Sequence, residues 1–307
     1  MRLGLICLVL VGVGWGQKVA VTFDDLPSNG SLAASQTMEG VARDVVKILK
    51  KRHVPPAYGF INAVKLEGSA DGAAGLSAWA AGEPVGNHTY LHMNLSENPA
   101  ELFEKNIAQN EPVLELLSAS TKNGATGNAA KRDWHWFRYP YLNEGDTLEK
   151  RRAVREYLAK RGYRIAEVTM DWEDYLWNFA AAKCEEKHDA KAMQWLHDSY
   201  LKTASTYIDF DRELAKQVYG REINHVLLLH LGAYSTTILP EMFDLLKKKG
   251  LTLVTLEEAE SDPAYGEDPD VASKDGGSLT DLMLMKKGMK FPEVEPKPYK
   301  ELKEICQ

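Results

Sequence analysis

Short apolar runs alternate with longer segments of helical periodicity over most of the chain. Apolar runs of this kind are typical of buried strands in parallel sheets. We expect strands at residues 19–23, 57–61, 84–87, 134–137, 163–170, 226–229 and 251–256. Helical patterns fall between them, at 35–50, around Leu76 and Trp79, from Pro99 onward, at 148–160, over a long polar stretch at 174–221, and at 239–249.

This alternation of strands and helices predicts an α/β fold whose parallel strands are joined by right-handed crossovers. The count of about seven strands favours a barrel, complete or incomplete, and makes an open sheet the less favoured alternative. We expect one catalytic domain at residues 17–260. Residues 261–307 are rich in Gly, Pro, Asp and Lys, which predicts a loosely packed tail of the same domain.

The first 16 residues have the pattern of a secretory signal peptide. Arg2 precedes an apolar run from Leu3 to Val13, and small residues follow, so cleavage before Gln17 is expected. The run is too short to span a bilayer, so we expect no membrane span after cleavage. A retained anchor is the alternative. The pattern predicts a secreted or periplasmic protein.

Composition narrows the class of protein further. With 307 residues, 44% of them apolar, the chain can bury a sizeable core. Its net charge of −7 argues against nucleic-acid binding, which needs a basic surface. After signal cleavage only Cys184 and Cys306 remain, and a disulfide between them is possible in an oxidising compartment, although the sequence does not require it.

Two adjacent carboxylates, Asp24 and Asp25, directly follow the first apolar strand. Catalytic side chains of α/β folds collect where parallel strands end. Neighbouring carboxylates repel each other when buried, so a cation or a chemical task must compensate for them. The alternative is an ordinary pair of helix-capping residues in a loop.

His88 and His92 form an H-x-x-x-H pattern directly after another expected strand. In a helical turn, side chains four residues apart share a face, so both imidazoles could reach one metal ion. Two histidines and one carboxylate suit Zn²⁺, with Co²⁺, Fe²⁺ or Mn²⁺ as alternatives. A pair of surface histidines is the competing interpretation. The sequence contains neither the H-E-x-x-H of metalloproteases nor a G-x-S-x-G serine nucleophile.

Three further sites also follow apolar strands. Arg138 precedes Tyr139-Pro140-Tyr141 and could hold a nearby carboxylate ionised. Asp171-Trp172 and His230 are weaker signals alone, because an Asp can cap a helix and a lone His can sit satisfied in the core. Their shared position at strand ends makes them informative together.

With these residues in place, the chain resembles the polysaccharide deacetylases with a NodB-homology domain, carbohydrate esterase family 4. Five motifs match in order: Thr22-Phe23-Asp24-Asp25, His88-Thr89-Tyr90-Leu91-His92, Arg138-Tyr139-Pro140-Tyr141, Asp171-Trp172 and Leu228-Leu229-His230. The resemblance implies a deformed (β/α)7-type barrel with parallel strands. It also implies that Asp25, His88 and His92 bind the metal, that Asp24 is the general base tethered by Arg138, that the Tyr141 backbone N–H binds the oxyanion, and that His230 is the general acid oriented by Asp171.

The implied activity is hydrolysis of N-acetyl groups on an amino-sugar polysaccharide, such as a chitin-, peptidoglycan- or exopolysaccharide-like glycan, by attack of a metal-bound water. Zn²⁺ is the first choice of metal. Leu26 and Leu142 stand where the family commonly has Gly, and their bulk could reshape the groove. Hydrolysis of another amide, as in a sugar deformylase, therefore stays open, as does a secreted carbohydrate-binding protein with a vestigial site.

Overall fold

The fold is built around a seven-stranded parallel sheet. The computed structural model describes residues 16–122 and 133–307. The expected signal segment therefore lies outside the described residues, apart from Gly16. The strands are β1 Lys18–Asn29, β2 Gly59–Ile61, β3 Val85–Asn87, β4 Trp136–Phe137, β5 Arg164–Ile165, β6 His225–Gly232 and β7 Thr252–Val254. All seven lie within or overlap the segments predicted from the apolar runs, and every strand pair is parallel.

β1 pairs with three strands, more than any other strand of the described sheet. Its residues Val19 to Asp24 pair with β6 along one edge. On the other edge β7 pairs with its start and β2 with its later part. β1 is almost wholly buried, which explains the apolar run at Val19–Phe23 in its first half.

The predicted strand at 163–170 is divided into two pieces. Its beginning forms β5, which pairs with β4 at one end of the strand order β5-β4-β3-β2-β1-β6. Its end, Met170, makes a parallel bridge to Leu227 of β6, at the other end of that order. The segment thus connects the two ends of the sheet. The result is the deformed barrel that the resemblance implied.

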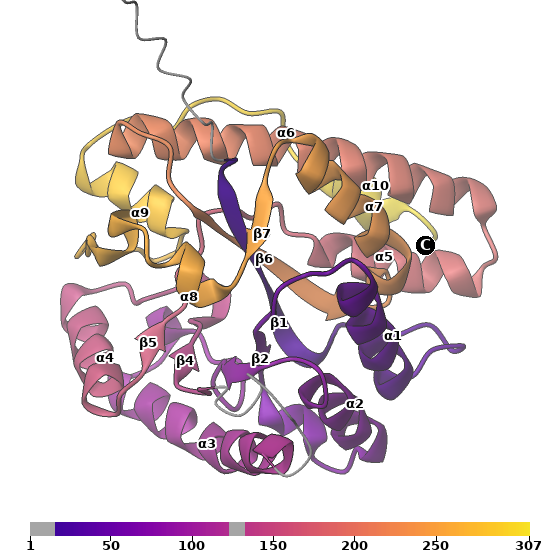
Figure 1. The fold of residues 1–307 in the computed structure, drawn as a ribbon, viewed down its shortest axis with the longest axis horizontal. Coiled ribbons are helices and arrows are strands. Elements are labelled where there is room, and N and C mark those ends of the chain that lie inside the picture. The colour runs from indigo at the N-terminus through magenta and orange to yellow at the C-terminus, as the bar shows by residue number, and fades with distance from the viewer. Residues whose placement is uncertain (1–15, 123–132) are drawn as a thin grey trace, which may run out of the picture.

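Helices surround the strands, as Figure 1 shows. They are α1 Met38–Lys51, α2 Ala70–Ala80, α3 Ala100–Lys122, α4 Leu148–Lys160, α5 Tyr175–Glu186, α6 Ala190–Tyr219, α7 Ser235–Lys248, α8 Leu256–Ala259, α9 Leu279–Lys286 and α10 Tyr299–Glu304. The long polar stretch at 174–221 is two helices, because Asp189 caps the start of α6 with its carboxylate. In the described part of the chain, no helix is long and apolar enough to cross a membrane.

The C-terminal residues are ordered against the barrel and are not a loose tail. Leu279 and Met283 of α9 pack on Leu214 and Val218 of α6. The chain end lies beside α5 in Figure 1, where Cys306 forms a disulfide with Cys184. The pairing that the sequence left open is therefore present.

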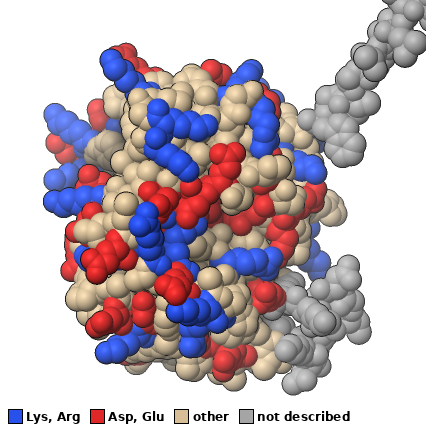
Figure 2. Space-filling model, turned by 90° about the vertical axis from the view of Figure 1, so that its left-hand side faces the viewer, with Lys and Arg blue, Asp and Glu red and all other residues tan. Residues whose placement is uncertain are grey.

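Charged side chains of both signs share the surface. Figure 2 shows one face, on which Lys and Arg side chains are interspersed with Asp and Glu side chains. Among the described residues of this face there is no uniform basic patch of the kind that nucleic-acid-binding surfaces carry.

Candidate active site

The C-terminal ends of β1, β3, β4 and β6 deliver polar side chains to one cavity of about 480 Å³. Its wall contains the predicted residues Asp24, Asp25, His88, His92, Tyr141, Asp171 and His230, together with Asn29, Leu142, Glu173, Tyr175, Phe179, Leu228 and Asp275. The carboxyl ends of parallel strands meet at one edge of the sheet, which is why motifs far apart in sequence converge here. Arg138 lies behind this wall, in contact with Asp24.

Asp25, His88 and His92 form a compact group. One ligand atom from each lies within 4.8 Å of the others. Asp25 Oδ1 is 3.2 Å from His92 Nε2 and 3.8 Å from His88 Nε2. The structure thus brings together the three residues that the sequence assigned to a metal.

The H-x-x-x-H segment is not the helical turn that its spacing predicted. It is an irregular bend, in which Thr89 has φ 60° and His92 has φ 54°. The bend still brings the two imidazole rings to 4.9 Å between centroids. The expectation of adjacent histidines was therefore correct, but the reason given for it was wrong.

Three features of the group fit a divalent cation. Asp25 Oδ1 is buried without a hydrogen-bond donor, and a buried anionic oxygen in that state needs a cation. The His88 Nδ1–H donates to the Arg138 carbonyl at 2.7 Å, which leaves His88 Nε2 with its lone pair for a ligand. Burial lowers the pKa of both histidines, so each stays in the neutral form that binds metals.

The Asp25 carboxylate is held by residues that the sequence analysis did not single out. Asn29 Nδ2 donates to Asp25 Oδ2 at 2.7 Å. Lys65 Nζ donates to the backbone carbonyls of Asp25 and Ser28 at 2.7 and 3.1 Å. Although burial alone raises the pKa of Asp25, Lys65 and His92 outweigh it and hold that pKa below its usual range. Asn29 lies four residues after Asp25 at the end of the same strand. This position is the only feature of the sequence that could have identified it as a site residue.

Asp24 is fixed by Arg138, as predicted. Arg138 Nη1 lies 3.2 and 3.3 Å from the two Asp24 carboxylate oxygens, and both side chains are buried. Thr22 Oγ1 and the Ala166 carbonyl accept from the same guanidinium, so its orientation is fixed. Burial raises the pKa of Asp24 to about 6, while Arg138 opposes the rise. Asp24 is therefore ionised at neutral pH but basic enough to take a proton.

His230 is bound by a different aspartate from the one predicted. Asp174 accepts from His230 Nδ1 at 2.7 Å and from the His230 backbone N–H at 3.0 Å. Asp171 instead accepts from the Glu173 N–H. The assignment of Asp171 as the orienting residue is therefore corrected to Asp174, three residues further along the same loop. The sequence therefore predicted the correct loop but the wrong aspartate within it.

The charge of Asp174 changes the acidity of His230. Burial alone would lower the pKa of His230, but Asp174, with help from Asp25 and Asp24, raises it to about 9. Asp171, which also lines the cavity, has its pKa raised to about 6 by burial. At neutral pH the cavity therefore holds a protonated imidazolium and a deprotonated Asp24.

Unusual backbone conformations concentrate around this cavity. Six non-glycine residues with positive φ lie at or beside the strand ends: Asp25, Thr89, His92, Tyr141, Leu142 and Glu173. Such conformations cost on the order of 1 kcal/mol each and persist where the surrounding structure holds them. Their clustering sets this region apart from the regular barrel.

Aromatic side chains form the rim of the cavity. The Tyr141 ring is 58% exposed and lies 4.4 Å from the His92 ring, centroid to centroid. Phe179 and Tyr175 of α5 line the wall that holds His230. Leu142 also lines the cavity, but Leu26 is fully buried in the core, so the expectation that Leu26 reshapes the groove is wrong.

Comparison with known proteins agrees with this geometry. A family model described as polysaccharide deacetylase matches residues 14–166, the part that contributes Asp24, Asp25, His88, His92 and Arg138. The chain belongs to the polysaccharide deacetylase family. A search of curated proteins finds no match.

A solved chitin deacetylase shares the fold, and two other solved structures show a weaker similarity. The chitin deacetylase of Colletotrichum lindemuthianum is 20% identical, with a TM-score of 0.50 over 78% of this chain and 86% of that one. A family 4 carbohydrate esterase from Streptomyces lividans is 17% identical, covering 79% and 95% of the two chains with a TM-score of 0.44. The peptidoglycan deacetylase PdaC of Bacillus subtilis is 19% identical, covering 80% and 92% with a TM-score of 0.44.

Proposed function

We propose that the protein is a metal-dependent hydrolase that removes N-acetyl groups from an N-acetylated amino-sugar glycan. The observation that carries this proposal is one cavity that holds an Asp–His–His group, the buried Asp24 carboxylate bound by Arg138, and His230 bound by Asp174; the pKa values of Asp24 and His230 are both raised. A base and an acid whose environments separate their pKa values are what amide hydrolysis needs. Membership of the polysaccharide deacetylase family supports a glycan substrate.

Asp25, His88 and His92 would hold the divalent metal, with Zn²⁺ as the first choice and Co²⁺, Fe²⁺ or Mn²⁺ as alternatives. When bound, such an ion acts as a Lewis acid that polarises the amide carbonyl and acidifies water. Asn29 and Lys65 keep Asp25 oriented toward the two histidines.

Asp24 would act as the general base. Its carboxylate, oriented by Arg138, takes the proton of the attacking water, since its pKa of about 6 keeps it ionised at neutral pH. The Tyr141 backbone N–H would donate to the oxyanion that develops on the carbonyl oxygen. Tyr141 lies on the cavity wall, beside His92, where such a donor is needed.

His230 would act as the general acid. The leaving amine needs a proton to depart, and the imidazolium can supply it from Nε2 because Nδ1–H is bound to Asp174. Its pKa of about 9 keeps the acid form populated at neutral pH. After proton transfer, Asp174 stabilises the ring in the correct tautomer for the next cycle.

The site of action is proposed to lie outside the cytoplasm, in the periplasm or the medium. The Cys184–Cys306 disulfide supports this, since disulfides persist in oxidising compartments. The signal-like pattern of residues 1–16 points the same way.

Acetate release from N-acetylated glycans tests the function directly. The purified protein is incubated with chitooligosaccharides, peptidoglycan fragments and an N-acetylated exopolysaccharide, with and without a chelator, beside Asp24→Asn as the matched control. We expect acetate from at least one glycan, loss with chelator, return with Zn²⁺, and at least ~10²-fold slower release by the variant. Release of formate but not acetate would favour a deformylase. Binding of glycan without any release would contradict the hydrolase.

A further inference from the structure

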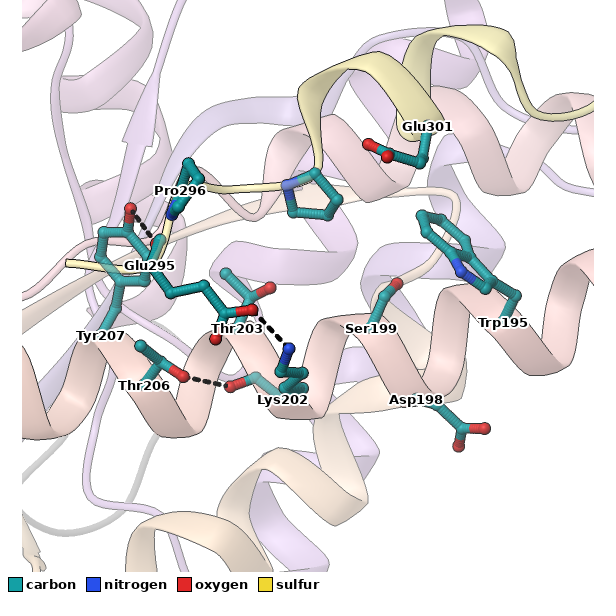
Figure 3. Close-up of a pocket in the computed structure, with 11 residues that line it drawn as sticks. Trp195, Asp198, Ser199, Lys202, Thr203, Thr206, Tyr207, Glu295, Pro296 and Glu301 are labelled. Atoms are coloured by element: carbon teal, nitrogen blue, oxygen red, sulfur yellow. Dashed lines mark hydrogen bonds and ion pairs between the residues drawn. The ribbon is translucent and has the colours of Figure 1, made fainter.

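The C-terminal segment at residues 295–299 contacts α6 at one end and the wall of the active-site cavity at the other. Figure 3 shows it crossing α6, where Glu295 meets Lys202 and Tyr207. Lys202 Nζ lies 2.5 Å from Glu295 Oε1, and the Tyr207 hydroxyl donates to the Glu295 carbonyl at 3.3 Å. A cavity of about 370 Å³ lies between α6 and this segment. The segment is therefore held by individual contacts such as these and not by continuous packing.

Beyond Glu295, two side chains of the segment bind Glu173 in the wall of the active-site cavity. Lys297 Nζ lies 2.9 Å from Glu173 Oε2, and the Tyr299 hydroxyl donates to the same oxygen. The Lys297 side chain is only 11% exposed, and its ammonium lies 4.5 Å from the centre of the Tyr207 ring. A lysine buried to this degree pays a desolvation cost that only a close anion offsets.

Glu173 occupies a backbone conformation that needs external support. Its φ is 58°, in the left-handed region that glutamate rarely adopts. Its own N–H donates to Asp171 Oδ1 at 2.7 Å. The next residue is Asp174, whose two carboxylate oxygens accept from the backbone and the imidazole of His230. The conformation of Glu173 therefore decides where the His230 partner lies.

The other end of the segment is fixed to the same wall. After Tyr299 the chain forms α10 and reaches Cys306, whose disulfide partner Cys184 is on α5. α5 begins at Tyr175, directly after Asp174. The loop at 171–174 therefore leads directly into a helix that is tied to the chain end, and Glu173 within the loop is bound by Lys297 and Tyr299. All of these residues lie beyond the matched family region, which ends at residue 166.

We infer that Lys297 and Tyr299 are positioning residues for the general acid: by holding Glu173, they fix Asp174 and through it the imidazole of His230. The inference rests on the proposed function for the role of His230. It gives the C-terminal segment a part in the reaction, although none of its residues touches the reacting atoms.

Kinetics of Lys297→Met test this, with Lys297→Arg as the conservative variant. Lys300→Met, at an exposed lysine of the adjoining α10, is the matched control. Loss of the ion pair between Lys297 and Glu173 should lower kcat by roughly 10-fold, since misplacing a catalytic group by about an ångström costs up to ~10²-fold. KM and metal content should stay within about twofold, because Asp25, His88 and His92 are untouched. Lys297→Arg should recover most of kcat, and Lys300→Met should match the wild type.

A double variant separates action through Glu173 from general weakening. If Lys297 works through Glu173, the Lys297→Met/Glu173→Gln pair should be no slower than the slower single variant. Additive losses of kcat in the double variant would overturn the inference in favour of a merely structural role. A fall in both KM and kcat, with a lower melting temperature, would do the same if it also occurred in Lys297→Arg.

A spectroscopic readout keeps the inference testable without turnover. The low-field NMR signal of the His230 Nδ1 proton, identified by its loss in His230→Gln, reports the bond to Asp174. We expect it in the wild type and in Lys300→Met, and expect it broadened or absent in Lys297→Met. A wild type that releases no acetate but shows this pattern would refute the proposed function and leave the positioning intact. An unchanged signal in Lys297→Met would refute the positioning itself.

Discussion

Asp174→Asn is the substitution that best tests the acid half of the site. Asparagine keeps the size of the side chain and an oxygen that can accept from His230 Nδ1, but it removes the negative charge. The hydrogen bond to His230 Nδ1 at 2.7 Å can therefore remain, whereas the amide NH2 group that replaces the second oxygen cannot accept from the His230 backbone N–H at 3.0 Å. With the Nδ1 bond kept, a lower pKa of His230 in Asp174→Asn reports mainly the loss of the Asp174 charge.

The magnitude follows from the position of His230. Its pKa of about 9 compares with an ordinary 6.5, which at 1.36 kcal/mol for each pKa unit is a preference of roughly 3 kcal/mol for the protonated form. Burial opposes protonation, so the neighbouring carboxylates supply more than this net figure, and Asp174 is the largest contributor among them. Removing one close opposite charge lowers a pKa by roughly 1 to 3 units.

The alkaline limb of the kcat–pH profile measures this shift. The acid form of His230 is lost as pH rises through about 9 in the wild type, and the limb should move down by roughly 1 to 3 pH units in Asp174→Asn. Asp171→Asn is the control, because Asp171 makes no hydrogen bond to His230, and its limb should move less. A limb that moves in Asp171→Asn but not in Asp174→Asn would restore the assignment made from the sequence.

Unfolding at two pH values gives an independent check. Because the folded state raises the pKa of His230, the stability from its protonation is complete below pH 6.5 and is lost as pH rises through about 9. The wild type should therefore exceed Asp174→Asn in unfolding free energy most strongly below pH 6.5. The difference should shrink above pH 9. A difference that does not change with pH would mean that Asp174 acts through packing alone.

Four other changes have expected outcomes. Asp24→Asn should keep its metal while kcat falls at least ~10²-fold, whereas Asp25→Asn should lose metal and regain activity in excess metal; the reverse pattern in metal analysis would exchange the two roles. Asn29→Ala should weaken metal affinity by roughly 10-fold or more in a competition titration, because Asp25 loses its orienting donor, and an unchanged affinity would exclude that role. Replacing Cys184 and Cys306 by Ser should lower the unfolding free energy by about 2–4 kcal/mol in urea, and no loss of stability would count against the disulfide.

The barrel and the metal group could be predicted from the sequence because both depend on local patterns. Apolar runs located all seven strands, and residues directly after those runs had to meet at one edge of the sheet. The contact between Arg138 and Asp24 follows from the same rule. Helical spacing, by contrast, gave the wrong local structure for His88 and His92, since two left-handed residues turn that segment sharply.

The remaining features depend on contacts between distant residues. Asp171 and Asp174 both follow the same expected strand, and only the path of the loop through Glu173 decides which one reaches His230. The C-terminal segment gave no signal beyond its composition, because the pairing of Lys297 with Glu173 joins residues 124 positions apart. A side chain that acts through another element is not visible in a pattern along the chain.

The placement of β1 sets an order of events during synthesis. β1, the first strand of the described chain, pairs with β6 and β7, which are synthesised last. More than two thirds of the polypeptide must therefore leave the ribosome before residues Val19–Asp24 can pair with β6. Until then a long apolar edge stays open to other chains. The matched region at 14–166 therefore does not mark a unit that can fold alone, since its first strand, β1, obtains two of its three partners only from residues outside it.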